Sequence, residues 1–113
     1  MKKYDIPKHR RGDTWPGINS ITIATNGVPV NLTNATIKID FRRDIDTPVA
    51  LTLSTTNGDI VITQPLQGTF SILPKLIEIP FGTYVYDLQV TFANGVVTTY
   101  MEGSWEILAD ITE

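Results

Sequence analysis

The stretch TYVYDLQVTF, residues 83–92, decides the fold class, because large apolar side chains alternate along it with mostly polar ones. A period of two places successive side chains on opposite faces of a β-strand. One face of this strand therefore belongs to a core, and it carries Tyr84, Tyr86, Leu88, Val90 and Phe92. The stretch ATIKIDFR, residues 35–42, alternates in the same way and places on one face Ala35, Ile37, Ile39 and Phe41.

Turn signals divide the rest of the chain into further short strands. The pairs Asn26-Gly27, Asn57-Gly58 and Asn94-Gly95 each separate two alternating stretches. Asn-Gly is a favoured pair in tight hairpins because both residues tolerate positive φ, so the sequence predicts three hairpins. Pro29 has no N–H to donate to a ladder, and we expect its strand at a sheet edge.

Residues 68–73 and 104–108 complete a set of eight or nine short strands without a convincing helix. This pattern predicts an all-β, Ig-like antiparallel β-sandwich that forms one domain over residues 1–113. Tyr84 follows Gly82 at the start of a strong strand, where immunoglobulin domains carry a corner tyrosine. Tyr86 then takes the place of the strand F cysteine, and its ring can fill the space of a disulfide.

The charges are distributed unevenly along the chain, although the formal net charge is only −3. Basic residues dominate the first thirteen positions, and acidic residues are the only charged ones in residues 102–113. We expect residues 1–10 to be a basic, solvated arm whose deletion leaves the fold intact. Charge complementarity suggests that this arm contacts the acidic end of a neighbouring copy in a homo-oligomer. The predicted interface comprises Lys2, Lys3, Arg10, Arg11, Trp15, Glu102, Glu106 and Asp110.

Other partners and compartments receive little support from the composition. The basic segment offers only Tyr4 and Trp15 for base stacking, and we do not expect nucleic acid to bind. No apolar run approaches the ~20 residues of a membrane helix, so no membrane partner is expected. The N-terminus has no apolar segment typical of a secretory signal, which indicates synthesis in the cytoplasm.

The inventory of reactive side chains argues against an enzyme. The chain contains no cysteine and one histidine, His9, which lies in the charged N-terminal segment. A histidine-based triad would need that segment to fold back onto a site. No glycine-rich phosphate loop precedes a helix. We therefore predict no catalytic and no cofactor-binding residues.

A calcium site is the alternative that the carboxylates leave open. Asp44 and Asp46 could join Asp40 or Asp59, because Ca²⁺ prefers several oxygen ligands. Their spacing matches no calcium loop, and arginines stand beside them at positions 42 and 43. A solvated connection with Asx-turns is the preferred interpretation, and no metal site is predicted.

Residues 11–13 spell Arg-Gly-Asp, the motif that integrins read on extracellular proteins. Gly12 permits a bend, Asp13 can bond to the backbone that follows it, and residues 15–17 end the segment. The motif runs directly into a tryptophan and the first strand, without an export signal. We interpret it as a structural bend.

Four pieces of the chain resemble one family: RRGDTW (10–15), VNLTNATIKIDFRRD (30–44), GTYVYDLQVTFANG (82–95) and EGSWEIL (102–108). They are similar to the Ig-like N-terminal domain of bacteriophage baseplate upper proteins, over about residues 9–110. The resemblance implies a non-catalytic virion structural protein, a tail or baseplate docking module that self-assembles and contacts other virion proteins. It also implies that the protein is made in the bacterial host cytoplasm and resides in the virion.

Two groups of alternatives remain open on the same sandwich. Because family members usually continue into further domains and this chain ends at residue 113, a capsid-decoration, neck or fibre-base protein is an alternative. A carbohydrate-binding or adhesive module is another. It would need an aromatic platform with Trp15 and Trp105 exposed on one surface.

Overall fold

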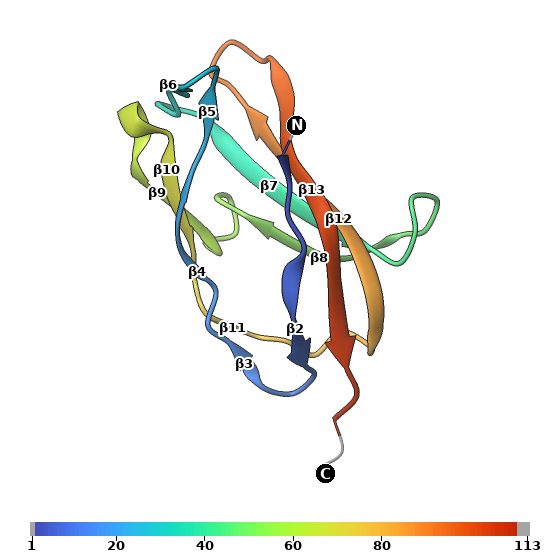
Figure 1. Cartoon of the computed structure of the whole chain (residues 1–113). Coiled ribbons are helices and arrows are strands. Elements are labelled where there is room, and N and C mark those ends of the chain that lie inside the picture. The colour runs from blue at the N-terminus through green and yellow to red at the C-terminus, as the bar shows by residue number, and fades with distance from the viewer. Residues whose placement is uncertain (1, 111–113) are drawn as a thin grey trace.

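Two β-sheets pack face to face in the computed structural model, which describes residues 2–110 (Figure 1). The larger sheet has the order β1-β13-β12-β7-β8, and β2 also pairs with β13. Its strands are β1 (Lys2–Lys3), β2 (Ile6–Arg10), β13 (Val97–Leu108), β12 (Gly82–Thr91), β7 (Thr36–Arg42) and β8 (Val49–Ser54). The smaller sheet, in the order β4-β10-β9, contains β4 (Ile18–Thr22), β10 (Thr69–Ile72) and β9 (Ile60–Gln64).

Two short ribbons and one helical turn complete the structure. Strand β3 (Thr14–Trp15) pairs with β11 (Lys75–Leu76), and β5 (Ala24–Thr25) pairs with β6 (Val28–Pro29). A 3₁₀ turn, η1 (Pro65–Gln67), precedes β10. Residues 2–110 contain no helix that is long and apolar enough to span a membrane. The prediction of an all-β, Ig-like antiparallel sandwich is confirmed.

The core lies between the two sheets, on the faces that the alternation predicts. The inward residues of β12 and β7 are buried, and they are Tyr84, Tyr86, Leu88, Val90, Ile37, Ile39 and Phe41. The Phe41 ring centroid lies 5.4 Å from that of Tyr86 and 5.2 Å from that of Trp105. Aromatic packing therefore fills the centre of this cysteine-free sandwich.

The tyrosine corner forms as predicted at the start of β12. The Tyr84 hydroxyl donates a hydrogen bond of 2.6 Å to the carbonyl oxygen of Pro80, four residues earlier. This bond ties the connection before β12 to the strand, as in immunoglobulin-type sandwiches. The guanidinium of Arg43 covers the outer side of the same ring, 5.0 Å from its centroid.

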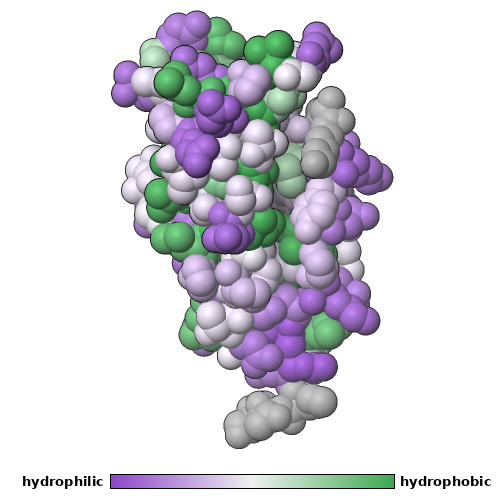
Figure 2. All heavy atoms as spheres, turned by 60° about the vertical axis from the view of Figure 1, so that its left-hand side comes forward, coloured by the Kyte–Doolittle hydropathy of each residue, from purple (hydrophilic) through white to green (hydrophobic). Residues whose placement is uncertain are grey.

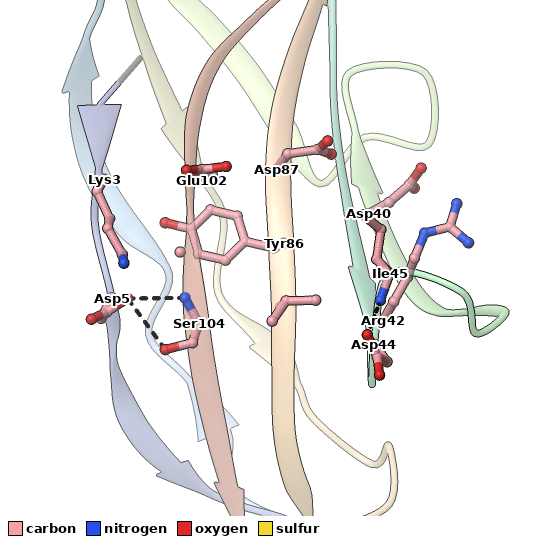
Figure 3. Close-up of a pocket in the computed structure, with 12 residues that line it drawn as sticks. Lys3, Asp5, Asp40, Arg42, Asp44, Ile45, Tyr86, Asp87, Glu102 and Ser104 are labelled. Carbon is pink, nitrogen blue, oxygen red and sulfur yellow. Dashed lines mark hydrogen bonds between the residues drawn. The ribbon is translucent and has the colours of Figure 1, made fainter.

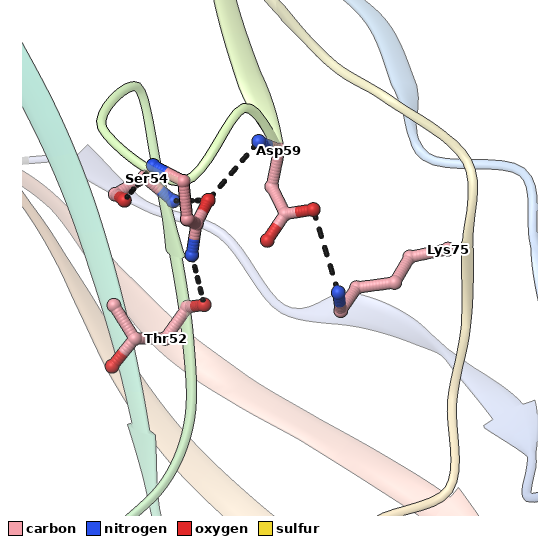
Figure 4. Close-up of polar contacts among 5 residues, drawn as sticks. Thr52, Ser54, Asp59 and Lys75 are labelled. Atoms are coloured by element: carbon pink, nitrogen blue, oxygen red, sulfur yellow. Dashed lines mark hydrogen bonds and ion pairs between the residues drawn. The ribbon is translucent and has the colours of Figure 1, made fainter.

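Two of the three predicted hairpins are confirmed and one is wrong. Asn26-Gly27, with φ values of 52° and 80°, joins β5 to β6, and Asn94-Gly95 lies between β12 and β13. Asn57-Gly58 joins β8 to β9, but these strands belong to different sheets. The Asn57 Oδ1 atom accepts hydrogen bonds from the backbone N–H groups of Ser54 and Asp59, and thus shapes a crossing between the sheets (Figure 4).

The expected basic arm is instead an edge strand of the larger sheet. Both β1 and β2 run parallel to β13, and the Tyr4 N–H between them donates to the Glu102 carbonyl at 2.8 Å. The side chain of Ile6, the first residue of β2, is buried in the core. The expectation of a solvated arm is therefore wrong, because the charges occupy the outward positions of a strand whose backbone pairs with β13.

Candidate functional site

The outward face of the six-stranded sheet holds a groove of about 510 Å³ (Figure 3). The three-stranded sheet packs on the other face, so the groove side is uncovered by any element of residues 2–110 (Figure 1). The groove runs from the N-terminal edge strand to the loop after β7 and is lined by Lys3, Asp5, Asp40, Arg42, Asp44, Ile45, Val85, Tyr86, Asp87, Glu102, Gly103 and Ser104.

A row of carboxylates crosses the middle of this groove. Asp87 on β12 stands directly opposite Glu102 on β13 and directly opposite Asp40 on β7. At the edge of the row, Lys3 on β1 lies in backbone register with Glu102 on β13. Like charges directly opposite one another on neighbouring strands destabilise a sheet. We call Glu102, Asp87 and Asp40 the acidic row.

The three carboxylates of the acidic row differ in whether a cation or a hydrogen-bond donor balances their charge. Asp40 lies 3.5 Å from the Lys38 ammonium and accepts a 2.7 Å hydrogen bond from the Thr52 hydroxyl. Among the side chains that the structure describes, those of residues 3–110, none forms a hydrogen bond or an ion pair with the carboxylates of Asp87 and Glu102. The central carboxylate thus faces two acidic neighbours with no cation in contact.

Apolar side chains flank the row on the side of the loop after β7. Val85 is 42% exposed and Ile45 is 81% exposed, which is high for large aliphatic residues. The Arg42 guanidinium, which also lines the groove, donates to the Thr47 carbonyl at 2.8 Å and is therefore held by the loop that follows its own strand. The groove therefore combines uncompensated negative charge with exposed apolar surface.

Tyr86 connects the groove to the core. Gly103 faces it across the ladder, and a Cβ at Gly103 would overlap the Tyr4 carbonyl oxygen and approach the Tyr86 ring. The Tyr86 hydroxyl donates to that Tyr4 carbonyl at 2.5 Å. Burial raises the pKa of the Tyr86 phenol well above its ordinary value of 10, and the neighbouring Tyr4 and Asp5 raise it further. Tyr86 is thus a neutral donor that supports the groove.

The predicted interface residues are spread over several environments. Parallel pairing of the first and last strands brings the two ends of one chain together, and Arg11 forms an ion pair with Asp110 at 3.4 Å. Arg10 donates to the Ala109 carbonyl at 2.8 Å. Lys2 belongs to β1, and Glu106 is exposed on β13. The complementarity expected between copies is therefore partly satisfied within the chain.

Of the predicted interface residues whose side chains the structure describes, Lys3 and Glu102 line the groove and the others do not. Trp15 is a core residue, 5% exposed, and its ring centroid lies 4.9 Å from that of Trp105, which is fully buried. Trp15 is therefore wrong as an interface residue. The same burial removes the exposed aromatic platform that a carbohydrate-binding module would need, and that alternative is also wrong.

The Arg-Gly-Asp segment is a bend between β2 and β3, as interpreted. Gly12, at φ +90°, donates its N–H to the Ile77 carbonyl at 2.8 Å. The His9 ring Nε2 bonds to the Asp13 carbonyl at 2.8 Å. These contacts fix the entry to the small β3–β11 ribbon.

The acidic residues of the calcium alternative do not all meet at one point, because Asp40 and Asp44 line the groove and Asp59 does not. Asp44 closes a turn, since its side chain accepts from the Ile45 N–H at 2.6 Å and its N–H bonds to the Thr47 hydroxyl at 2.9 Å. Asp59, which directly precedes β9 of the smaller sheet, pairs with Lys75 at 3.4 Å (Figure 4). In the part of the chain that the structure describes, no group of three His, Asp or Glu side chains could hold a metal ion.

Comparison with known proteins finds a likeness at the level of fold. No family model matches the chain, and no curated protein matches it. The solved structure of CopC from Methylosinus trichosporium OB3b is similar, with a TM-score of 0.44 and 11% identity over 89% of this chain and 94% of that chain. At 11% identity, the likeness does not assign a role to any residue of this chain.

These findings correct the family expectation. No phage baseplate family matches the chain, and a solved structure that is similar to it is CopC, which is not a virion protein. The baseplate resemblance is therefore wrong, together with the virion function, its capsid, neck and fibre-base alternatives, the virion partners and the virion localisation drawn from it. The four quoted pieces are mostly strand alternation and turn residues, and such patterns recur in unrelated sandwiches.

Proposed function

We propose that this chain is a non-catalytic recognition domain that binds a cationic segment of another protein in the groove on its six-stranded sheet. The observation that carries the proposal is the acidic row, in which Asp87 faces Glu102 and Asp40 without a cation of its own. An arrangement that lowers stability without a folding benefit is typical of a functional site.

The shape and lining of the groove favour a polypeptide segment. Neighbouring strands lie about 4.8 Å apart, so the row presents carboxylates at intervals that successive cationic side chains can match. The exposed Val85 and Ile45 beside the row add apolar surface for a neighbouring side chain. A lysine- or arginine-containing segment with one aliphatic residue satisfies both features.

The remaining side chains support a binding role over a catalytic one. The sole histidine, His9, bonds to the turn at Asp13 and does not line the groove. The Arg42 guanidinium and the Asp5 carboxylate are held by local hydrogen bonds, the latter to the Ser104 N–H at 3.0 Å. A pre-formed, locally fixed lining reduces the ordering that a bound segment must impose.

The test is a titration of ¹⁵N-labelled protein with the synthetic peptide Arg-Ser-Leu-Ser-Arg. We expect amide shift changes centred on residues 40, 85, 87 and 102, and none with the peptide in which glutamate replaces arginine. Asp87→Asn should weaken binding several-fold. Glu78→Gln, which removes an exposed carboxylate outside the groove, should leave it unchanged. Equal weakening by both variants, or shift changes spread over all surface acids, would contradict the proposal.

A further inference from the structure

We infer that the outer edge of β13 is a strand-binding slot, and that the N-terminal strand of a second copy can fill it in place of the chain's own. The N-terminal strand is defined here as residues 2–10, which include β1 and β2. This inference is independent of the proposed recognition of cationic segments, because it concerns the edge of the sheet and not the acidic row.

Two buried aromatic side chains direct their only donors at the N-terminal strand. The Trp105 indole N–H donates to the Pro7 carbonyl at 3.0 Å, and the Tyr86 hydroxyl donates to the Tyr4 carbonyl at 2.5 Å. Trp105 is 0% exposed and Tyr86 is 5% exposed. Buried donors are almost always paired in native proteins, so an empty slot would leave both without a partner.

The backbone of β13 is also shaped for this strand. Lys3 pairs with Glu102, Ile6 with Trp105 and Arg10 with Leu108 in parallel register. The register of this ladder shifts between Trp105 and Ile107, opposite residues 6–9, and before this shift the Tyr4 carbonyl lies over Gly103. A side chain at position 103 would collide with that carbonyl, so glycine is the residue that leaves the slot open.

The strand is attached to the rest of the molecule at few points. Within residues 2–110, β1 and β2 pair with β13 and with no other strand, and Ile6 is the one buried residue of β2. The bend at residues 11–13 links it to β3. An identical strand from a second copy can make every one of these contacts, which is the condition for exchange between protomers.

Charge favours a second copy as the donor. The exposed side chains of the N-terminal strand include Lys3, Lys8 and Arg10, while the whole chain has a net charge of −3. A released strand is therefore attracted to the acidic body of another molecule. Addition of a strand to a sheet edge through main-chain bonds and side-chain pockets is an established mode of protein association.

The test uses full-length protein and a fluorescent peptide of residues 2–12. In wild-type protein the chain's own strand competes for the slot. Ile6→Ala weakens that competitor and leaves the slot intact, so the variant should bind the wild-type peptide at least about tenfold more tightly than wild-type protein does. Lys8→Ala, at an exposed position of the same strand, should leave binding unchanged.

Two further reagents separate the slot from general attraction of a basic peptide. A scrambled peptide of the same composition should not bind in the slot of the Ile6→Ala protein. The double variant Ile6→Ala, Gly103→Ala should not bind the wild-type peptide. Equal binding by wild-type and Ile6→Ala proteins, or by wild-type and scrambled peptides, would overturn the inference. If Ile6→Ala does not fold alone, the wild-type peptide should restore its cooperative melting transition, and failure to restore it would equally overturn the inference.

Discussion

The two faces of the six-stranded sheet follow different rules although they share the same strands. On the inward face of β12, Tyr84, Tyr86 and Leu88 are buried and each packs in the core. On the outward face of the same strand, Asp87 stands between two other acids. The inward face is explained by burial of apolar area. The outward face opposes the rule for cross-strand charges, and this difference points to a role in recognition.

The outward face of the smaller sheet shows that exposure alone does not require such charges. Strands β4, β9 and β10 contain no acidic or basic residue, and hydroxyls meet across them, as in the 2.9 Å bond between Thr22 and Thr69. From this side of the molecule, weakly polar residues with scattered hydrophobic ones cover much of the middle, and strongly hydrophilic residues lie near both the upper and the lower end (Figure 2). The acidic row is therefore a specific property of the larger sheet.

The largest expected effect comes from emptying the inward face. Phe41 is fully buried against Tyr86 and Trp105, and Phe41→Ala should lower the free energy of unfolding by about 3–5 kcal/mol. Urea denaturation followed by tryptophan fluorescence measures this change. Val85→Ala on the outward face is the control and should cost well under half as much. Similar losses for the two variants would remove the distinction between the faces.

A second effect depends on pH and again concerns an inward residue. The pKa of Tyr86 is raised in the folded state, so the folded protein holds this proton more tightly than the unfolded chain. The resulting stability is complete below pH 10, the ordinary pKa of the phenol, and is lost as the pH rises toward the folded pKa. The loss should approach about 1.4 kcal/mol per pH unit.

Tyr86→Phe tests this coupling by comparison with wild type in denaturation curves measured between pH 8 and pH 11.5. The variant loses the hydrogen bond to Tyr4 and should be less stable at pH 8. The gap should then narrow as the pH rises above 10, because only the wild type has this phenol to ionise. A gap that stays constant across the range would show that Tyr86 is not the titrating group.

A smaller effect is expected at the tyrosine corner. Tyr84→Phe keeps the buried ring and removes the 2.6 Å bond to the Pro80 carbonyl. Pro80 itself is exposed, so water can replace the lost donor, and the cost should be about 0.5–1.5 kcal/mol. Thermal unfolding of the purified variant measures it. A loss as large as that of Phe41→Ala would mean that the corner holds more of the core than its geometry indicates.

The inward face and the corner could be predicted from the sequence because both depend on local patterns. Alternation placed Phe41 and Tyr84 correctly, and the tyrosine after Gly82 indicated the corner. The hairpin predicted at Asn57-Gly58 was wrong, because the same pair of residues can also shape a crossing between two sheets. Which of the two forms depends on where β9 packs. The parallel N-terminal strand was missed because Pro7 and its charges hide the alternation, and its position depends on pairing with β13.

The groove could not be predicted from the sequence for a related reason. Glu102, Asp87 and Asp40 lie far apart in the sequence and meet only through the register of three strands. A slip of one residue would move a strand's side chains to the opposite face. The alternation indicated that Asp40 and Asp87 face outward, but no local pattern indicated that they face each other.

The smallest effect tests the acidic row itself. Asp87→Asn keeps the size of the side chain and removes the central charge, so it should raise the free energy of unfolding by about 0.2–1 kcal/mol. Asp40→Asn is the matched control, because Asp40 is already compensated by Lys38 and by the Thr52 hydroxyl. It should not stabilise the protein. The measurement is urea denaturation at low salt and at about 1 M NaCl, where the Debye length falls to about 3 Å.

Salt distinguishes charge repulsion from any other consequence of the substitution. If Asp87 is destabilising through its acidic neighbours, the gain from Asp87→Asn should shrink at high salt, since mobile ions already screen the row. A gain that persists unchanged would indicate a packing or hydration effect of the amide. A loss of stability at low salt would show that the row is compensated in solution, and the acidic row would then no longer oppose folding. In that case the main reason for assigning recognition to this face would fall, while the packing account of the inward face would stand.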